Sequence, residues 1–170
     1  RPQIKNYFNL HGLWPQDMTD FRNSPQDCSD VLITAGQMPD DVYYQFTNYW
    51  NALFGEEYRL INHEWTKHGS CWNAKPKDMN QIPEEIKTTI TRAIETNGRS
   101  VRDHQHNYIL IAIDLAKKYN HYNALATNGI FPSNVKPVSK SDILAAIQSY
   151  YNVQSFTILC EKTSKLSGQS

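Results

Sequence analysis

Two short segments of this sequence concentrate side chains that can move protons and bind a phosphate. The first contains His11, and the second contains His63, Glu64, Lys67 and His68. The unperturbed pKa of histidine is about 6.5, so two histidines can act as base and acid in one catalytic cycle. RNA cleavage requires such a pair. One imidazole takes the proton of the 2′-hydroxyl, which attacks its own phosphorus, and the other protonates the departing 5′-oxygen.

Spacing within the second segment assigns partners to these groups. On a helix, residues four positions apart lie on one face, which pairs His63 with Lys67 and Glu64 with His68. The first pair makes a positive pocket suited to a phosphate, and Glu64 can hold or charge His68. Together, Lys67, His63 and Glu64 would stabilise a five-coordinate phosphorus, an electrostatic contribution commonly worth a few kcal/mol. His11, on a separate strand, would face this helix across a cleft.

The same histidine cluster raises the alternative of a metallohydrolase. Helical zinc motifs place two histidines four residues apart, whereas His63 and His68 are five apart. At roughly 100° per residue these side chains diverge by about 140°, too far to share one metal. We therefore expect neither a metal nor a cofactor. Taken alone, His11 is better explained as a structural residue, and the helix cluster is equally compatible with a solvated face that carries one salt bridge.

The elements that must position these residues follow from hydrophobic periodicity and turn-forming residues. Alternation over Lys5 to Trp14 predicts a strand with His11 at its end, and Ile61 to Gly69 predicts a short helix. Residues 16–37 are rich in Asp, Ser, Asn, Pro and Gly, which is typical of a long surface loop. The other predicted elements are helices over residues 40–54, 83–97, 103–120 and 141–151, and a strand over residues 155–160.

Composition places the chain among ordinary globular proteins. It has 170 residues, 39% of them hydrophobic and 20% charged, which predicts one domain with its own core. Helices dominate and at least two strands are expected, so the predicted class is α+β. The formal net charge is zero, and no Lys/Arg block provides an electrostatic docking tail. The longest aliphatic stretch, Ile109 to Ile113, is far too short to cross a membrane.

Phe8 to Pro15 and His63 to Cys71 resemble the two active-site segments of the T2 ribonuclease family, which includes the plant S-ribonucleases. Further similarity of pattern covers most of the chain, at residues 107–119, 129–133 and 141–160. The resemblance implies one ribonuclease T2-like domain over residues 1–170, trimmed at both ends, in which an antiparallel sheet packs with several helices. Trp72 to Asp103 looks like an insertion relative to many members, and we assign it no function.

The resemblance implies a role for each candidate catalytic residue. His11 resembles the proton donor to the leaving oxygen and His68 the base that acts on the 2′-hydroxyl, although the reverse assignment stays open. His63 would bind the scissile phosphate, and Glu64 with Lys67 would stabilise the pentacoordinate state. The implied enzyme is an endoribonuclease that cleaves single-stranded RNA, not DNA, through a 2′,3′-cyclic phosphate and with low sequence specificity.

The resemblance also implies residues for base recognition and for a disulfide. Trp14 resembles the aromatic wall of a base pocket, where stacking contributes about 1 to 3 kcal/mol per base. Gln16 occupies a position where some relatives carry an acidic residue that contacts the base. Cys28 is expected to pair with Cys71, whereas the usual partner of Cys160 would lie further downstream than this sequence extends.

Disulfide use and the habit of the family favour a secreted, lysosomal or vacuolar protein. We expect a monomer whose partner is single-stranded RNA and which does not associate with a membrane. The main alternative within the same fold is a secreted recognition or effector protein, which would act by binding a receptor or RNA without turnover.

Overall fold

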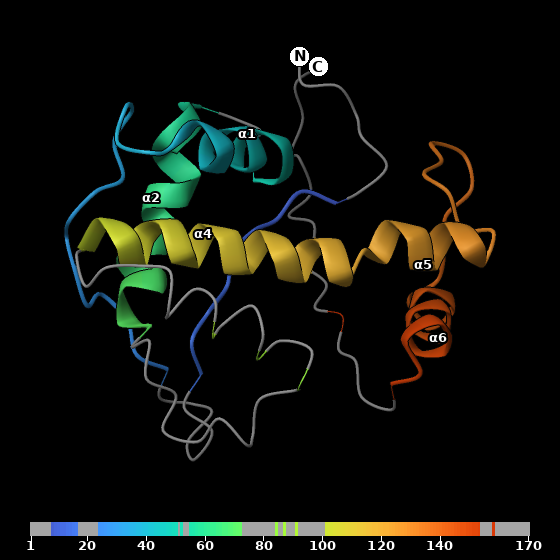
Figure 1. Cartoon of the computed structure of the whole chain (residues 1–170). Helices are drawn as coiled ribbons and strands as arrows, with labels where there is room; N and C mark the ends of the chain where they lie inside the picture. Colours follow the sequence, from blue (N-terminus) through green and yellow to red (C-terminus); the bar gives the residue numbers. More distant parts are fainter. Residues whose placement is uncertain are drawn as a thin grey trace, which may run out of the picture. The chain divides into compact units, whose positions relative to one another are not determined.

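The computed structural model describes residues 8–16, 24–50, 52, 55–72, 84, 87, 91, 101–153 and 158, with the backbone alone for residues 101–103. The helices with defined bounds are α1 (Asp40–Tyr49), α2 (Glu57–Lys67), the 3-10 helix η1 (Gly69–Cys71), α4 (Val101–Lys118), α5 (His121–Thr127) and α6 (Lys140–Tyr151) (Figure 1). The described residues form two compact units. The larger unit comprises those within 8–119, and the smaller unit those from Asn120 onward.

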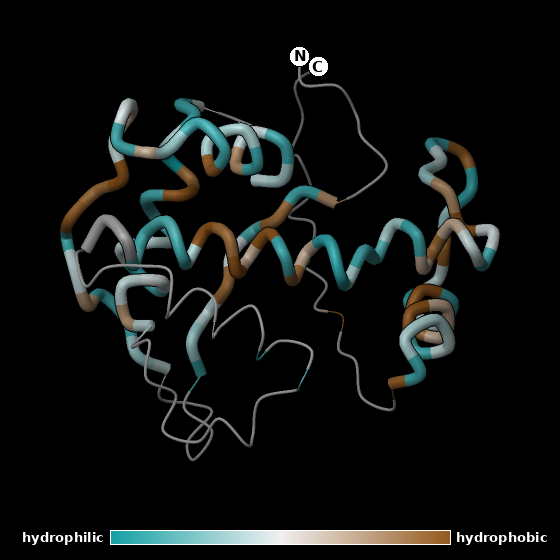
Figure 2. Tube along the Cα trace, viewed as in Figure 1, coloured by the Kyte–Doolittle hydropathy of each residue, from teal (hydrophilic) through white to brown (hydrophobic). Residues whose placement is uncertain are grey.

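The core of the larger unit is built by α1, α2 and α4. Its buried side chains come from all three helices and include Val42, Phe46, Ile61, Trp65, Tyr108, Ile109 and Ile113. Hydrophobic and hydrophilic residues alternate along α4 in Figure 2, as expected when an amphipathic helix packs one face against a core. Burying one large apolar side chain stabilises a fold by about 1.5 to 3 kcal/mol, so this cluster fixes the three helices relative to one another.

Helix α1 forms where the sequence predicts a helix but ends earlier. Asp40 and Asp41 lie in its first turn, where carboxylates interact favourably with the helix dipole. The prediction extended to residue 54, whereas α1 ends at Tyr49. The carbonyl of Tyr49 accepts a hydrogen bond from Leu10 N at 3.0 Å. The end of α1 is therefore capped by the N-terminal segment, and this contact brings that segment onto the core.

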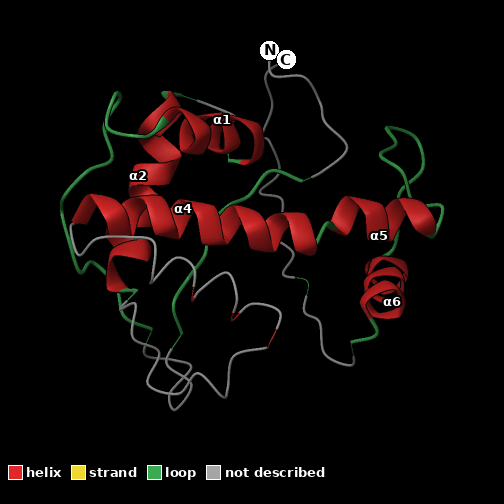
Figure 3. Ribbon diagram, viewed as in Figure 1, coloured by secondary structure: helices red, strands yellow, loops and turns green. Residues whose placement is uncertain are grey.

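Residues 8–16 do not form the predicted strand. No strand occurs in the part of the chain that the structure describes (Figure 3). Two distant side chains, one just after α1 and one on α4, bind the backbone of this segment in place of a strand ladder: Trp50 Nε1 donates to His11 O at 2.8 Å, and the Tyr108 hydroxyl donates to Leu13 O at 2.9 Å. Residues 5–7 of the predicted strand lie outside the described residues, and the antiparallel sheet stays a prediction.

The loop that follows is fastened to α2 by side chains. Asn62 accepts a hydrogen bond from Ile33 N at 2.7 Å and donates one to Ile33 O at 3.0 Å. Val31 O accepts a hydrogen bond from Trp65 Nε1 at 2.9 Å. Residues 24–37 thus form the predicted loop, and amide and indole groups of the helix bind its backbone in place of a neighbouring strand.

Two further predicted helices are present with different bounds, and two predicted elements lie largely outside the described residues. Helix α2 begins at Glu57, before the predicted start at Ile61, and α4 covers Val101–Lys118 where the sequence predicts 103–120. The predicted helix over 83–97 and strand over 155–160 lie largely outside the described residues, although residues 84, 87 and 91 are helical. The single domain stays a prediction. None of the described helices combines the length and apolar character that crossing a bilayer requires.

The smaller unit consists of α5, α6 and the connection between them. Each helix begins at a side-chain cap, because Asn120 and Ser139 accept a hydrogen bond from a backbone N–H of the first turn. Helix α6 starts at Lys140, one residue before the predicted start, whereas the seven-residue α5 was not predicted. The two helices pack against each other and bury Ala124, Ala146 and Ile147.

Candidate active site

Glu64 is the centre of a buried polar network on α2. Its side chain is only 1% exposed. Carboxylate oxygen Oε1 lies 3.3 Å from His11 Nε2, and Oε2 accepts a hydrogen bond from Trp14 Nε1 at 2.7 Å. Burying a carboxylate is costly unless its oxygens are bonded, and here each oxygen has a partner. The structure thus brings the first predicted segment onto the second.

The direct partners of Glu64 differ from those that helical spacing predicts. His68 is the C-cap of α2, with φ −124° and ψ −57°, outside the helical geometry that places side chains four residues apart side by side. The carboxylate instead contacts His11 and Trp14, and it acts on His68 through its charge. The charge of Glu64 raises the pKa of His68, but burial lowers that pKa more, so the prediction that Glu64 can hold or charge His68 stays a prediction.

The backbone around His11 is held tightly although its side chain is 73% exposed. Trp50 Nε1 binds the carbonyl of His11. The following residue is Gly12, where a Cβ would meet the Glu64 carboxylate and lie 2.7 Å from Trp14 Nε1. Only a residue without a side chain allows the segment to approach α2 this closely. Gly12 therefore permits the contact between Glu64 and its two partners.

Tyr108 is a positioning residue that the sequence did not single out. Its hydroxyl donates to Leu13 O at 2.9 Å and accepts from Leu13 N at 3.3 Å. Burial raises the pKa of Tyr108 above its ordinary value, and the charge of Glu64 acts in the same direction. The hydroxyl therefore stays protonated and can serve both backbone groups. The available signal was the aromatic-rich pattern of residues 107–119, which showed a core face but not this contact.

His68 occupies a different environment at the end of α2. Burial is the largest influence on its pKa, which it lowers below the ordinary histidine value. The charges of Glu64 and Asp27 oppose this shift, whereas those of Lys67 and His63 add to it. The Nδ1 atom is buried and has no hydrogen-bond partner within the described ranges. At neutral pH the ring is consequently neutral and able to accept a proton.

Trp14 contacts both histidines. The centroid of its ring lies 5.1 Å from that of His68, with the planes tilted by 35°, and 5.8 Å from that of His11 in an edge-on arrangement. The side chain is nevertheless 55% exposed. An exposed indole beside two imidazoles provides an aromatic surface next to the groups that could transfer protons.

The two remaining predicted catalytic residues lie on α2. His63 is exposed, and Lys67 is half-buried in the last turn. Both act on the pKa of His68 in the direction expected of neighbouring positive charge. The structure therefore brings all five predicted catalytic residues to one end of α2 and the segment packed beside it.

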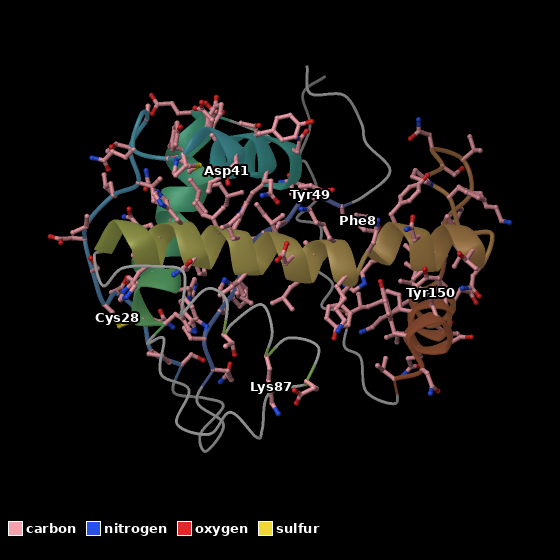
Figure 4. The ribbon with its side chains drawn as sticks, in the orientation of Figure 1. Phe8, Cys28, Asp41, Tyr49, Lys87 and Tyr150 are labelled. Atoms are coloured by element: carbon pink, nitrogen blue, oxygen red, sulfur yellow. A yellow bond between two sulfur atoms is a disulfide. The ribbon has the colours of Figure 1, made fainter. Side chains whose placement is uncertain are left out.

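A disulfide closes the loop onto the same end of α2. Cys28 and Cys71 are bonded, as the resemblance implied, and Figure 4 labels Cys28 in this loop. Next to it, Asp27 N donates to Lys67 O at 2.9 Å.

Gln16 Oε1 accepts a hydrogen bond from the Ser24 hydroxyl at 3.1 Å, and the predicted contact of Gln16 with a base stays a prediction. Cys160 and most of the predicted insertion lie outside the described residues.

The described residues also include side chains that could be ligands for a metal ion. Among the residues that the structure describes, no group of three or more His, Cys, Asp or Glu side chains is arranged to hold a metal ion. The expectation that the chemistry needs no metal stays a prediction.

Comparison with known proteins matches the whole chain, residues 1–170, to the model of the Ribonuclease T2 family. Ribonuclease Rh of Rhizopus niveus is 27% identical over 155 residues, which cover 88% of this chain and 58% of that protein. Ribonuclease T2 of Aspergillus oryzae is 26% identical over 160 residues, which cover 91% of this chain and 52% of that protein. The chain thus spans little more than half the length of these two curated relatives.

Solved structures show the same fold. Ribonuclease MC1 from bitter gourd seeds superposes with a TM-score of 0.56 at 21% identity, covering 86% of this chain and 60% of that one. RNase NT in complex with 5′-AMP superposes with a TM-score of 0.55 at 22% identity, covering 84% of this chain and 57% of that one. The overall α+β class of these structures agrees with the predicted class, and the sheet of this chain stays a prediction.

Proposed function

Because the chain belongs to the ribonuclease T2 family, we propose that it is an endoribonuclease that cleaves single-stranded RNA without a metal, through a 2′,3′-cyclic phosphate and with little sequence specificity. The observation that carries this proposal is the convergence of His11, Glu64 and His68 around Trp14. One histidine is exposed beside a buried carboxylate, and the other is half-buried with a lowered pKa. Such a difference in environment suits one acid and one base.

The reaction follows from these environments. His68, neutral because burial lowers its pKa, takes the proton of the 2′-hydroxyl. The 2′-oxygen forms a bond to phosphorus while the bond between phosphorus and O5′ breaks. His11 gives its proton to O5′, and Glu64 lies close enough to stabilise the protonated imidazole before transfer. The products are a 2′,3′-cyclic phosphate and a 5′-hydroxyl.

The positively charged side chains at the end of α2 are proposed to bind the scissile phosphate and to stabilise its transition state. We assign the binding of the scissile phosphate to His63 and the stabilisation of the pentacoordinate state to Lys67 together with Glu64. The influence of His63 and Lys67 on His68 supports this assignment, because it places both charges near the proposed base. Charge develops on phosphorus oxygens in the transition state, where prepositioned cations are most effective.

Trp14 and Gln16 are the proposed base-binding residues. The exposed indole of Trp14 would stack on a base next to the scissile bond. Stacking tolerates any base, which accounts for the low specificity we propose. Gln16 would contact the base edge with its side-chain amide.

The substrate and setting follow from the same chemistry. DNA lacks the 2′-hydroxyl that acts as nucleophile, so only RNA would be cleaved. The disulfide supports a secreted, lysosomal or vacuolar location, since disulfides persist in oxidising compartments. We propose that the protein acts as a monomer without a membrane.

One assay tests the proposal. The purified protein is incubated in excess EDTA with a single-stranded RNA and with its 2′-deoxy counterpart, and the product ends are identified. Cleavage of the RNA alone, to cyclic phosphate ends, is the expected result. Activity that disappears with chelation would instead favour a metallohydrolase, and RNA that is bound but not cut would favour the binding protein.

A further inference from the structure

The smaller unit contains a hollow of about 670 Å³ that has no part in the chemistry proposed above. It lies between the loop over residues 128–138 and the side of α6. Pockets for small molecules range from about 300 to 1,000 Å³, so the hollow has room for one nucleotide.

The walls of the hollow provide a surface for a planar ring. Its loop side includes the apolar residues Ile130, Phe131, Pro132 and Val138, and its helix side includes the small residues Ala145 and Ser149. Phe131 is 56% exposed, so its ring is accessible to a ligand. An exposed ring beside a floor of small side chains lets a planar group stack without displacing bulky neighbours.

Two opposite charges line the same hollow. They are Lys136 on the loop and Asp142 in the first turn of α6. Within the residues described, neither side chain forms an ion pair or hydrogen bond. The Ser133 hydroxyl accepts hydrogen bonds from Val135 N and Lys136 N, which fixes the turn that carries the lysine. A complementary ligand presents an anion to the ammonium, a donor to the carboxylate and a planar body to the ring.

We propose that this hollow is an accessory site for a nucleotide of RNA whose base carries an exocyclic amino group. Phe131 stacks on the base, Lys136 binds the phosphate, and Asp142 accepts a hydrogen bond from the amino group. The choice of a nucleotide rests on the proposed function, in which RNA is the substrate. Cytosine meets these requirements, whereas uracil presents a carbonyl oxygen at the same position and is repelled by the carboxylate.

Cytidine and uridine 5′-monophosphates are therefore matched probes, since they differ only in this amino or oxo group and in the hydrogen that uracil carries on N3. Amide resonances of the ¹⁵N-labelled protein are followed by NMR during titration with each nucleotide. We expect CMP to shift the amides of residues 129–136 and 142–149, with an affinity about tenfold higher than that of UMP. Equal affinities, or shifts confined to the larger unit, would overturn the proposal.

Variants assign the roles of the two charges. Asp142→Asn should abolish the preference for CMP over UMP, because the amide no longer discriminates an amino from an oxo group. Lys136→Ala should weaken binding of CMP about tenfold while leaving that of cytidine nearly unchanged. Lys140→Ala is the matched control, since it removes the same charge nearby but does not line the hollow. Equal effects of Lys136→Ala and Lys140→Ala would contradict a built site.

The titration separates this proposal from the proposed function. It measures binding at amides of the smaller unit and requires no turnover. Absence of RNA cleavage would therefore overturn the endoribonuclease while the CMP shifts still decided the accessory site. Cleavage without those shifts would overturn the accessory site alone.

Discussion

The two candidate catalytic histidines are positioned by different parts of the fold. His11 lies on a segment without regular structure, and its backbone neighbourhood is bound by Trp50 and Tyr108 from distant parts of the chain. His68 caps α2, where the helix and the nearby disulfide between Cys28 and Cys71 place it. The proposed base thus depends mainly on nearby structure, whereas the proposed acid depends on long-range contacts. Changes that loosen one set of contacts should affect one histidine more than the other.

The largest effect is expected from removing either histidine. His11→Ala and His68→Ala should each lower kcat on single-stranded RNA by roughly a hundredfold or more, since acid-base groups contribute about 10² to 10⁴. His104→Ala, which changes a histidine of α4 outside the site, is the control and should retain full activity. Near-normal turnover in either site variant would exclude the assigned pair.

The disulfide should matter chiefly for stability on the side of His68. Replacing both Cys28 and Cys71 by Ser should lower the free energy of unfolding by about 2 to 4 kcal/mol, because the bond closes a long loop in the unfolded chain. Urea unfolding of the variant and the parent protein measures this. An unchanged midpoint would show that the loop is held by its contacts with Asn62 and Trp65 alone.

Glu64 contacts His11 and acts on the pKa of His68, so Glu64→Gln should affect both histidines. The variant keeps an oxygen for Trp14 but loses the charge beside His11, and we expect kcat to fall about tenfold or more. The charge of Glu64 raises the pKa of His68, so its removal should lower that pKa further. Because the base must be neutral, the acid limb of the pH profile should move to lower pH. A shift to higher pH would contradict this coupling.

The smallest effect is expected from Tyr108→Phe, which removes both hydrogen bonds to Leu13. The variant should lose about 1 kcal/mol of unfolding free energy. Its kcat should fall several-fold while the acid limb assigned to His68 stays in place. Tyr43→Phe, which removes a hydroxyl that donates to the exposed Glu57, is the matched control for stability. Equal changes in the two variants would remove the special role of Tyr108.

The sequence was most informative where local rules decide structure. Asp40 and Asp41 predicted a helix that does begin at Asp40, and Ser141 with Asp142 predicted a helix whose observed start, Lys140, is one residue earlier. The helix that carries His63, Glu64 and Lys67 was predicted because residues 61–68 contain no Gly or Pro and Gly69 follows, although the observed helix begins at Glu57. The disulfide came from family resemblance, and the structure contains it.

The features that the sequence did not predict depend on contacts between residues far apart in the chain. Alternation in residues 8–14 is compatible with a strand, but the partners of this backbone are side chains of Trp50 and Tyr108, far away in sequence. Helical spacing offered His68 as the partner of Glu64, while the observed partner, Trp14, is 50 residues away. Helix α5 was missed because seven residues show too little periodicity, although Asn120 provided a capping residue.

The assignment of His68 as the base and His11 as the acid is tested by the pH dependence of kcat/KM on single-stranded RNA, measured in excess EDTA for the parent protein and both histidine variants. The parent should give a bell-shaped profile, with the acid limb set by His68 and the basic limb by His11. His68→Ala should lose the acid limb and His11→Ala the basic limb, each at strongly reduced rates. Loss of the opposite limbs would reverse the roles of acid and base, and persistence of both limbs in both variants would contradict the two-histidine account.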